Sequence, residues 1–282
     1  MGTVFKTPKL GDPRLEEFPL GSLSRVSSEK KSLAFHAQVS TGKDVLNYGL
    51  TITPGKGLRI PAFGDVNILL ATVHLTKEAG MKERVQAISR YQLAMLLGDR
   101  SDQTYDRINK ALEIWQKTTF LFVTEYGEPG DLTAINKTFN VVSKVEEAGT
   151  DGGVFKLTWT EAFWSGFAQG AWQTVDLREA IKLRPVTQRL HCFVQSRFRG
   201  SPKLILPLSQ LVIHLGLAEG TPVFRNLQQV RSACRELEEL KWLPVDEGRF
   251  VKGDKEWGIS FSRAEPPVPV GAGVLEQSGS LG

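Results

Sequence analysis

Residues 88–115 constrain the fold most, because their apolar spacing and their breaks predict two short helices joined by a tight turn. The first helix would begin after Ser89, a favourable N-cap, and end at Gly98, which accepts the left-handed conformation common at helix ends. Ser101 can cap the second helix. The apolar positions expected to be buried are Tyr91, Leu93, Leu96, Leu97, Tyr105, Ile108, Leu112 and Trp115. The segment therefore predicts a helix-turn-helix.

The other side of the second helix carries polar and charged side chains. They are Gln103, Asp106, Lys110 and Lys117, flanked by Thr104, Arg107 and Asn109. Asn and Gln can bond adenine in the major groove of DNA, and Arg and Lys can bond guanine. This face is what a DNA recognition helix requires. The alternative is a solvated surface helix in an ordinary helical hairpin, because helix-turn-helix patterns also arise by chance.

A similar stretch returns about 118 residues further along the chain, at 208–242. Gln92-Leu93 and Leu97-Gly98 align with Gln210-Leu211 and Leu215-Gly216. We expect a second helix capped by Thr221, with Pro222 in its first position. Its expected buried stripe is Phe224, Leu227, Cys234 and Leu237, and its expected DNA-binding residues are Arg225, Asn226, Gln228, Gln229 and Ser232. An internal duplication of this kind predicts a composite binding site with two recognition helices.

Extended runs follow each pair of helices. After the first pair, 118–126, 138–145 and 154–160 are rich in β-branched and aromatic residues and are separated by glycine-rich turns. After the second, 249–261 predicts a hairpin whose tip carries Lys252. A helix-turn-helix followed by a small antiparallel sheet makes a winged helix, in which Lys144 could contact phosphate. The sequence thus predicts an α+β fold of two tandem winged-helix domains.

The expected domain organisation has four parts. Residues 1–32 are an irregular arm, 33–172 a winged-helix domain with an N-terminal hairpin, 173–263 a second winged-helix domain and 264–282 a disordered tail. Residues 161–171 hold an aromatic cluster with helical spacing, expected to be core that joins the two halves rather than a base-stacking surface. Pro185 is expected to break or kink a helical pattern over 175–198.

Charge supports a polyanionic partner without requiring one. The formal net charge is +4, and no acidic residue occurs between Ala180 and Ala218. The basic residues in that span include Arg197, Arg199 and Lys203. Each phosphate that such a side chain neutralises releases counterions and adds salt-dependent affinity, so these three are candidate DNA contacts. A solvated basic face is the other interpretation.

Catalytic and metal-binding patterns are not recognisable in the sequence. Cys192 and Cys234 are too few and too dispersed for a disulfide framework, and the four histidines stand singly. The TPGKG segment at 53–57 lacks the spacing of a phosphate-binding loop. We therefore expect no enzyme activity, no cofactor and no metal. No apolar run has transmembrane length and no signal peptide is visible, so we expect a cytoplasmic protein without a membrane partner.

Across about residues 16–243 the chain resembles plasmid replication initiator proteins of the RepA type, the replication initiator protein A family. The resemblance rests on the order of segments FPLGSLSR, YGLTITPGKGL, PAFGDVNILLATVHLT, SRYQLAMLLG, TYDRINKALEIWQKTTF, FKLTWTEAFWSGF and TQRLHCFVQSRF. It implies winged-helix domains that bind repeated origin sequences in double-stranded DNA, open a neighbouring A·T-rich segment and recruit the host replicative helicase or its loader. It also implies a monomer–dimer equilibrium in which dimers can repress the protein's own gene.

The residues predict DNA binding through both halves of the chain, and the resemblance implies a plasmid replication initiator. Because no nucleotide-hydrolysing site is visible, the energy for duplex opening is expected to come from binding and bending DNA. The alternative is a transcriptional repressor with two DNA-binding units and no role in replication. A third, more distant interpretation is a winged-helix scaffold that binds protein.

Overall fold

The computed structural model describes residues 19–23, 31–41, 44–128, 131–148, 153–168, 176–198, 202–217, 221–253 and 256–263. The helices of these residues are α1 (Phe63–Glu78), α2 (Arg90–Leu96), α3 (Asp102–Lys117), α4 (Glu161–Ala168), α5 (Leu177–Ala180), α6 (Pro185–Phe198), α7 (Leu208–Leu215) and α8 (Val223–Glu239). The strands are β1 (Leu33–Thr41), β2 (Asp44–Thr53), β3 (Val85–Ser89), β4 (Thr119–Glu128), β5 (Asp131–Phe139), β6 (Val142–Ala148), β7 (Val154–Trp159), β8 (Lys203–Pro207), β9 (Phe250–Lys252) and β10 (Trp257–Ser262). The expected α+β class, with several helices and small antiparallel sheets, is confirmed.

One order of elements occurs twice along the chain. The first repeat runs α1, β3, α2, α3, β6, β7, and the second runs α6, β8, α7, α8, β9, β10. In each, the first strand pairs with the last and the last pairs with the middle one, giving the sheet orders β3-β7-β6 and β8-β10-β9. The duplication therefore includes the preceding helix and a strand before each helix pair, and neither β3 nor β8 was predicted from the sequence.

A third sheet is inserted into the first repeat, which corrects the expected strand pairing. The hairpin β4–β5 follows α3 and joins β1–β2 in a four-stranded antiparallel sheet of order β1-β2-β4-β5. The run expected as one strand at 138–145 is two strands that lie in different sheets. Asn140 lies at the break, where its Nδ2 donates to the carbonyls of Gln116 and Thr118 at 3.1 and 3.0 Å. The hairpin β4–β5 is therefore not a wing of the small sheet β3-β7-β6.

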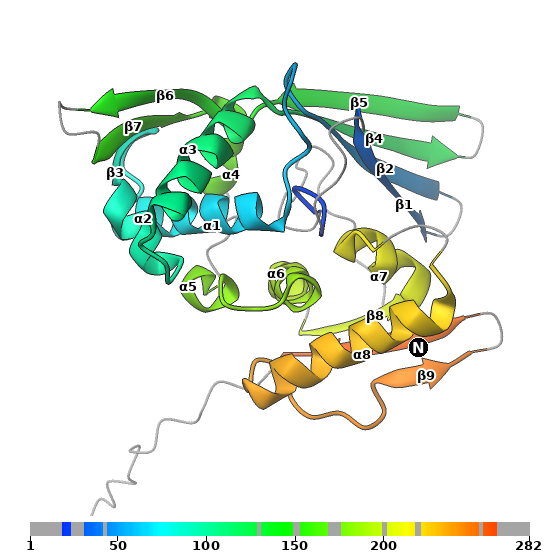
Figure 1. Ribbon diagram of the computed structural model, residues 1–282. Helices are drawn as coiled ribbons and strands as arrows, with labels where there is room; N and C mark the ends of the chain where they lie inside the picture. The colour runs from blue at the N-terminus through cyan, green and yellow to red at the C-terminus, as the bar shows by residue number, and fades with distance from the viewer. Residues whose placement is uncertain are drawn as a thin grey trace, which may run out of the picture.

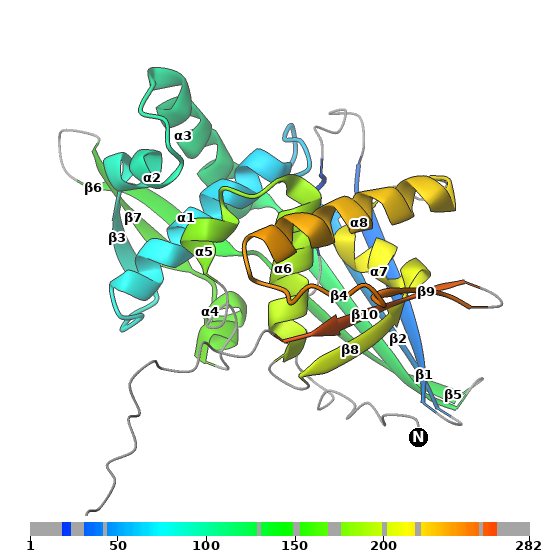
Figure 2. The same cartoon turned by 90° about the horizontal axis from the view of Figure 1, so that it is seen from below.

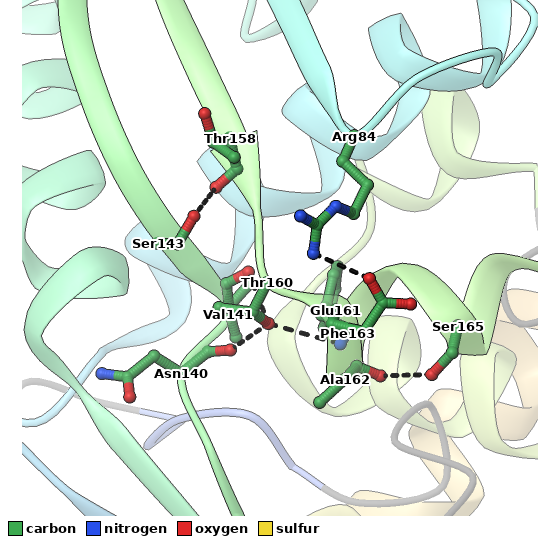
Figure 3. Close-up of polar contacts among 10 residues, drawn as sticks. All are labelled: Arg84, Asn140, Val141, Ser143, Thr158, Thr160, Glu161, Ala162, Phe163 and Ser165. Carbon is green, nitrogen blue, oxygen red and sulfur yellow. Dashed lines mark hydrogen bonds and ion pairs between the residues drawn. The ribbon is translucent and has the colours of Figure 1, made fainter.

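Polar contacts fix the junction between this insertion, the hairpin β6–β7 and α4 (Figure 3). The Thr160 hydroxyl donates to the Asn140 carbonyl, and it accepts the backbone N–H of Phe163 at 3.3 Å, so it caps the first turn of α4. Arg84 and Glu161 form an ion pair at 2.8 Å across the same junction. Phe163 stacks on Trp159 with ring centroids 5.2 Å apart, and both are buried in the first core. The described part of the aromatic cluster is therefore core of the first repeat, not a surface for bases.

Each repeat has its own hydrophobic core. The first contains Trp115, Phe120 and Leu157, and it extends to Leu177 and Ile181 around α5. The second begins at Leu183 and contains Leu211, Val230 and Ile259. In Figure 1 the sheets of the first half lie above α1 and α6, and the sheet of the second half lies below them. The two helices that begin the repeats thus lie between the layers.

Arg189 of α6 ties the N-terminal segment to the second repeat. It is buried, and its guanidinium donates to the Leu215 carbonyl at 2.9 Å and to the Gly21 carbonyl. Burial lowers its pKa to about 9, so it remains a cation at neutral pH. Gly216, with φ 64°, ends α7 beside it, and a Cβ there would collide with the guanidinium. Residues 19–23 of the expected irregular arm are therefore fixed in the fold, whereas the tail at 264–282 lies outside the described residues.

Candidate nucleic-acid interface

The turn between α2 and α3 is short and held by hydrogen bonds. Gly98 has φ 75°, and Ser101 caps α3 by accepting the backbone N–H of Thr104 at 3.3 Å. The Asp99 carboxylate accepts from the Thr104 and Ser101 hydroxyls and from the Ser101 backbone N–H at 2.9 Å. Those bonds, Thr104 first, lower the pKa of Asp99. The two helices are therefore joined by a short turn with a capped second helix, as the sequence predicted from Gly98 and Ser101.

The first two turns of α3 expose most of the expected residues. Gln103, Asp106, Arg107 and Lys110 are exposed, whereas Ile108, Leu112 and Trp115 are buried. Thr104 differs from the expectation: it is only 1% exposed, and its hydroxyl donates to the Asp99 carboxylate in the turn. It is a capping residue of the turn and does not face solvent.

Two lysines expected at the DNA surface form ion pairs elsewhere. Lys117 is the last residue of α3, lies against Gly55 and pairs with Glu113 at 2.7 Å. Lys144, on β6, pairs with Glu146 at 2.7 Å, and the hydrogen bond from Lys144 lowers the pKa of that carboxyl. Neither is grouped with the first turns of α3. The turn at 149–152, the expected wing tip, lies outside the described residues.

The first turn of α8 differs from the expectation in two ways. The helix begins at Val223 with Pro222 as N-cap, one residue later than expected, and no side chain caps it. Phe224, expected in the buried stripe, is 65% exposed, and Asn226, expected at the DNA surface, is 7% exposed. At 100° per residue the centre of the buried face lies between Leu227 and Val230, which turns Phe224 away from the core and brings Asn226 toward it.

Apart from Phe224 and Asn226, α8 exposes the side chains that the sequence predicted. Arg225, Gln228, Gln229 and Ser232 are exposed. Ser232 accepts a hydrogen bond from Arg184 at 3.3 Å, and Arg184 also pairs with Glu236. Ser232 therefore lies on the side of α8 that faces the start of α6, next to an ion pair.

The hairpin β9–β10 packs beside α8 through a cation held between aromatic rings. The Arg231 guanidinium lies 5.1 Å from the Phe250 ring and 5.3 Å from the Trp257 ring. Lys252 is exposed at the end of β9. This hairpin is where a second wing was expected, although 254–255 of its tip lie outside the described residues.

The acid-free span is not a continuous basic face, which corrects the electrostatic expectation. Arg189 is buried, and Lys182 and Arg184 pair with Glu179 and Glu236. Arg197 is partly buried with its guanidinium 5.5 Å from the Phe193 ring. Glu236 is distant in sequence from Arg184, whereas Glu179 lies three residues before Lys182, just outside the acid-free span. Lys203 is exposed at the start of β8, and Arg199 lies outside the described residues.

Three titratable side chains in or beside α6, those of His191, Cys192 and Cys234, are buried, and burial favours their neutral forms. Desolvation lowers the pKa of His191 to about 4, and the His191 ring lies 3.8 Å from the Trp242 ring. Burial raises the pKa of the Cys192 and Cys234 thiols to about 12, so both are unreactive at neutral pH. Within the described residues no three His, Cys, Asp or Glu side chains gather as a metal-binding group. Nor is any described helix both long and apolar enough to span a membrane.

The helices α3 and α8 lie on one side of the molecule. Figure 2 shows α3 at the top of the view and α8 across its upper middle on the right, whereas α4 and β8 lie toward the lower side. The exposed groups of the two helices are Gln103, Asp106, Arg107 and Lys110 on α3 and Arg225, Gln228 and Gln229 on α8. The two helices that carry these exposed hydrogen-bonding and basic residues therefore lie on a shared side of the molecule.

Comparison with known proteins identifies the fold. No family model matches the sequence, and no curated protein matches it. A solved structure of domains 2 and 3 of RctB, as the selenomethionine derivative, is similar to 90% of this chain and 99% of its own, with a TM-score of 0.62 and 15% identity. A second structure of RctB domains 2–3 matches 86% of this chain and 95% of its own, with a TM-score of 0.54 and 15% identity. The fold of nearly the whole chain is thus similar to that of two consecutive RctB domains.

Proposed function

We propose that the protein is a replication initiator that binds repeated origin sequences in duplex DNA through two winged-helix units. In this assignment α3 and α8 are the recognition helices, and the hairpins β6–β7 and β9–β10 are the wings. The repeated order helix, strand, helix, helix, hairpin supports it, as does the pairing of the first strand with the last in both small sheets.

The observation that carries the proposal is the common placement of the two helices. A recognition helix enters the major groove and contacts base edges with its N-terminal residues. Both α3 and α8 expose amide and guanidinium groups in their first two turns, and both lie on one side of the molecule (Figure 2). Two such helices on a shared side suit a long DNA site better than two unrelated short ones.

The role in replication rests on the fold. RctB, whose domains 2 and 3 have the similar fold, is a replication initiator. The resemblance of the sequence to RepA-type plasmid initiators points to the same class. Opening of an A·T-rich segment, recruitment of the host helicase or its loader, a monomer–dimer equilibrium and a cytoplasmic location belong to this proposal. The protein would act without catalysis, and the energy of opening would come from binding and bending DNA.

Footprinting of the purified full-length protein on the DNA that flanks its own gene tests the function. We expect protection of several tandem direct repeats beside an A·T-rich block, and enhanced reactivity of that block to a single-strand probe. Protection of one isolated inverted repeat, with no change in any A·T-rich block, would favour the alternative of a repressor. Absence of any protected sequence would contradict DNA recognition altogether.

A further inference from the structure

The first turn of α8 exposes two adjacent apolar side chains. Val223 is 62% exposed and Phe224 is 65% exposed. Val223 points along the same side of the helix as Leu227 and Val230, yet it stays outside the core cluster that contains them. The first turn of α8 therefore extends beyond the edge of the core, and its apolar groups contribute little to packing.

The residues around Val223 and Phe224 are basic, which favours binding of a polyanion such as DNA. The segment from Val223 to Arg235 contains no acidic residue and three arginines. The guanidinium of Arg225 lies 6.0 Å from the centre of the Phe224 ring, so a cation and an apolar group share one surface. The corresponding turns of α3 contain Asp102 and Asp106, and their large apolar side chains, Tyr105 and Ile108, are partly and fully buried in the first core. The apolar turn is thus specific to α8.

One helical turn after Phe224 and Arg225, α8 carries two glutamine side chains. Phe224 and Gln228 are four residues apart, as are Arg225 and Gln229, so each pair lies along one side of the helix. Gln228 and Gln229 are exposed. The exposed surface of α8 therefore has two rows of side chains. One row holds Phe224 and Gln228, and the other holds Arg225 and Gln229.

Thymine is the DNA base that an apolar side chain such as Phe224 can recognise in the major groove. The 5-methyl group of thymine is the apolar feature of the major-groove edge, and the adenine paired with it offers N7 and N6 to a Gln side chain. On the basis of the proposed function, we propose that the first turn of α8 selects A·T pairs, with Phe224 contacting thymine methyl groups and Gln228 bonding adenine. This makes Phe224 a specificity-determining residue.

Uracil, which is thymine without the methyl group, provides the test. A duplex selected from a randomised library by the full-length protein is resynthesised with deoxyuridine at one thymine position at a time. Wild-type protein is expected to lose about fourfold in affinity at one or two positions, the effect of burying one methyl group. Phe224→Ser is expected to bind the thymine duplex more weakly and to bind the thymine and uracil forms equally. Phe224→Leu should keep part of the difference.

The matched control is Ile205→Ser. Ile205 is 66% exposed, and it lies on the outer face of β8 because its neighbours Leu204 and Leu206 are buried. This variant should keep the full thymine preference. Sequence-selective binding by wild type with equal affinity for thymine and uracil at every position would overturn the inference alone, as would an unchanged ratio in Phe224→Ser. Failure of the library to yield any selected sequence would contradict the proposed function as well.

Discussion

The two repeats have the same order of elements but are built differently around their second helices. In the first, α3 leads into the hairpin β4–β5, which belongs to a separate four-stranded sheet before the chain returns to β6. In the second, α8 connects directly to β9, and buried Arg249 holds that connection by donating to the carbonyls of Pro244 and Ser260 at 2.6 and 3.0 Å. The comparison shows that the helix-strand framework is retained while the connections and the exposed chemistry vary.

The N-terminal ends of α3 and α8 differ in the same way. Ser101 and Asp99 cap the start of α3, and acidic residues balance Arg107 and Lys110 there. The start of α8 has no side-chain cap and exposes Phe224 beside Arg225. A charge-balanced surface contributes less to the attraction of phosphate than a basic one. We therefore expect α8 to supply more of the binding energy on DNA than α3.

The largest expected effect tests how α3 is anchored. Trp115 is fully buried, and its Nε1 donates to the Asp65 carbonyl of α1 at 2.9 Å. We expect Trp115→Ala to lower the free energy of unfolding by about 3 to 5 kcal/mol, since it leaves a large cavity and removes the hydrogen bond to α1. Urea denaturation followed by circular dichroism measures it. The control is Tyr91→Ala, because Tyr91, which was expected to be buried, is 53% exposed. A loss below about 1 kcal/mol would show that the first repeat does not depend on this anchor.

The second largest expected effect is a loss of folding stability in acid, caused by His191 in the second repeat. The pKa of His191 is about 4 in the folded protein and 6.5 when unperturbed, because burial disfavours its charged form. The unfolded chain therefore takes up the proton first as pH falls from 6.5 toward 4, and stability is lost in that window. At pH 4.5 this should cost about 2 to 3 kcal/mol relative to pH 7. His191→Phe should show a drop smaller by that amount in the same urea titration, and an identical drop in both proteins would refute the assignment.

A smaller effect compares the two recognition helices on DNA. Arg225→Ala should weaken binding to a selected duplex by about 1 to 3 kcal/mol and relax preference at one base position. Arg107→Ala should cost less, because the Arg107 guanidinium lies near Gly64 and interacts with Asp99. Gel-shift titrations on the selected duplex and on single-base variants measure both. Equal losses on every sequence for Arg225→Ala would make it a phosphate contact, and a larger loss for Arg107→Ala would reverse the order of the two helices.

Local signals in the sequence predicted much of this fold, and the errors arose where partners come from distant residues. Ser89, Gly98 and Ser101 act within one or two turns, so they marked the helix ends. The break before Pro185 was predicted for the same reason, because proline removes a backbone donor. In contrast, the assignment of β4–β5 to the sheet of β1–β2 depends on pairing across many residues. Sequence periodicity carries no information about that choice.

In the candidate site too, local spacing predicted some residues correctly and failed for others. Helical spacing correctly predicted exposure of Gln103, Lys110 and Gln229. It failed for Thr104, whose hydroxyl caps a turn, and for Phe224, although the angular position of Phe224 relative to Leu227 and Val230 was a usable signal. The acid-free span misled because its basic residues pair with acidic residues elsewhere, as Arg184 does with Glu236.

The proposed DNA recognition requires α3 and α8 to contact one DNA site together. A DNA-cleaving reagent tethered to a single introduced cysteine tests this, because Cys192 and Cys234 are buried with pKa values near 12 and stay unreactive. The chosen positions are Gln103→Cys on α3 and Gln229→Cys on α8, with Ile205→Cys on the outer face of β8 as the control. We predict strong cleavage from both helices at two different positions within one bound duplex, and little from the control. Cleavage from only one helix, or from neither above the control, would contradict the account.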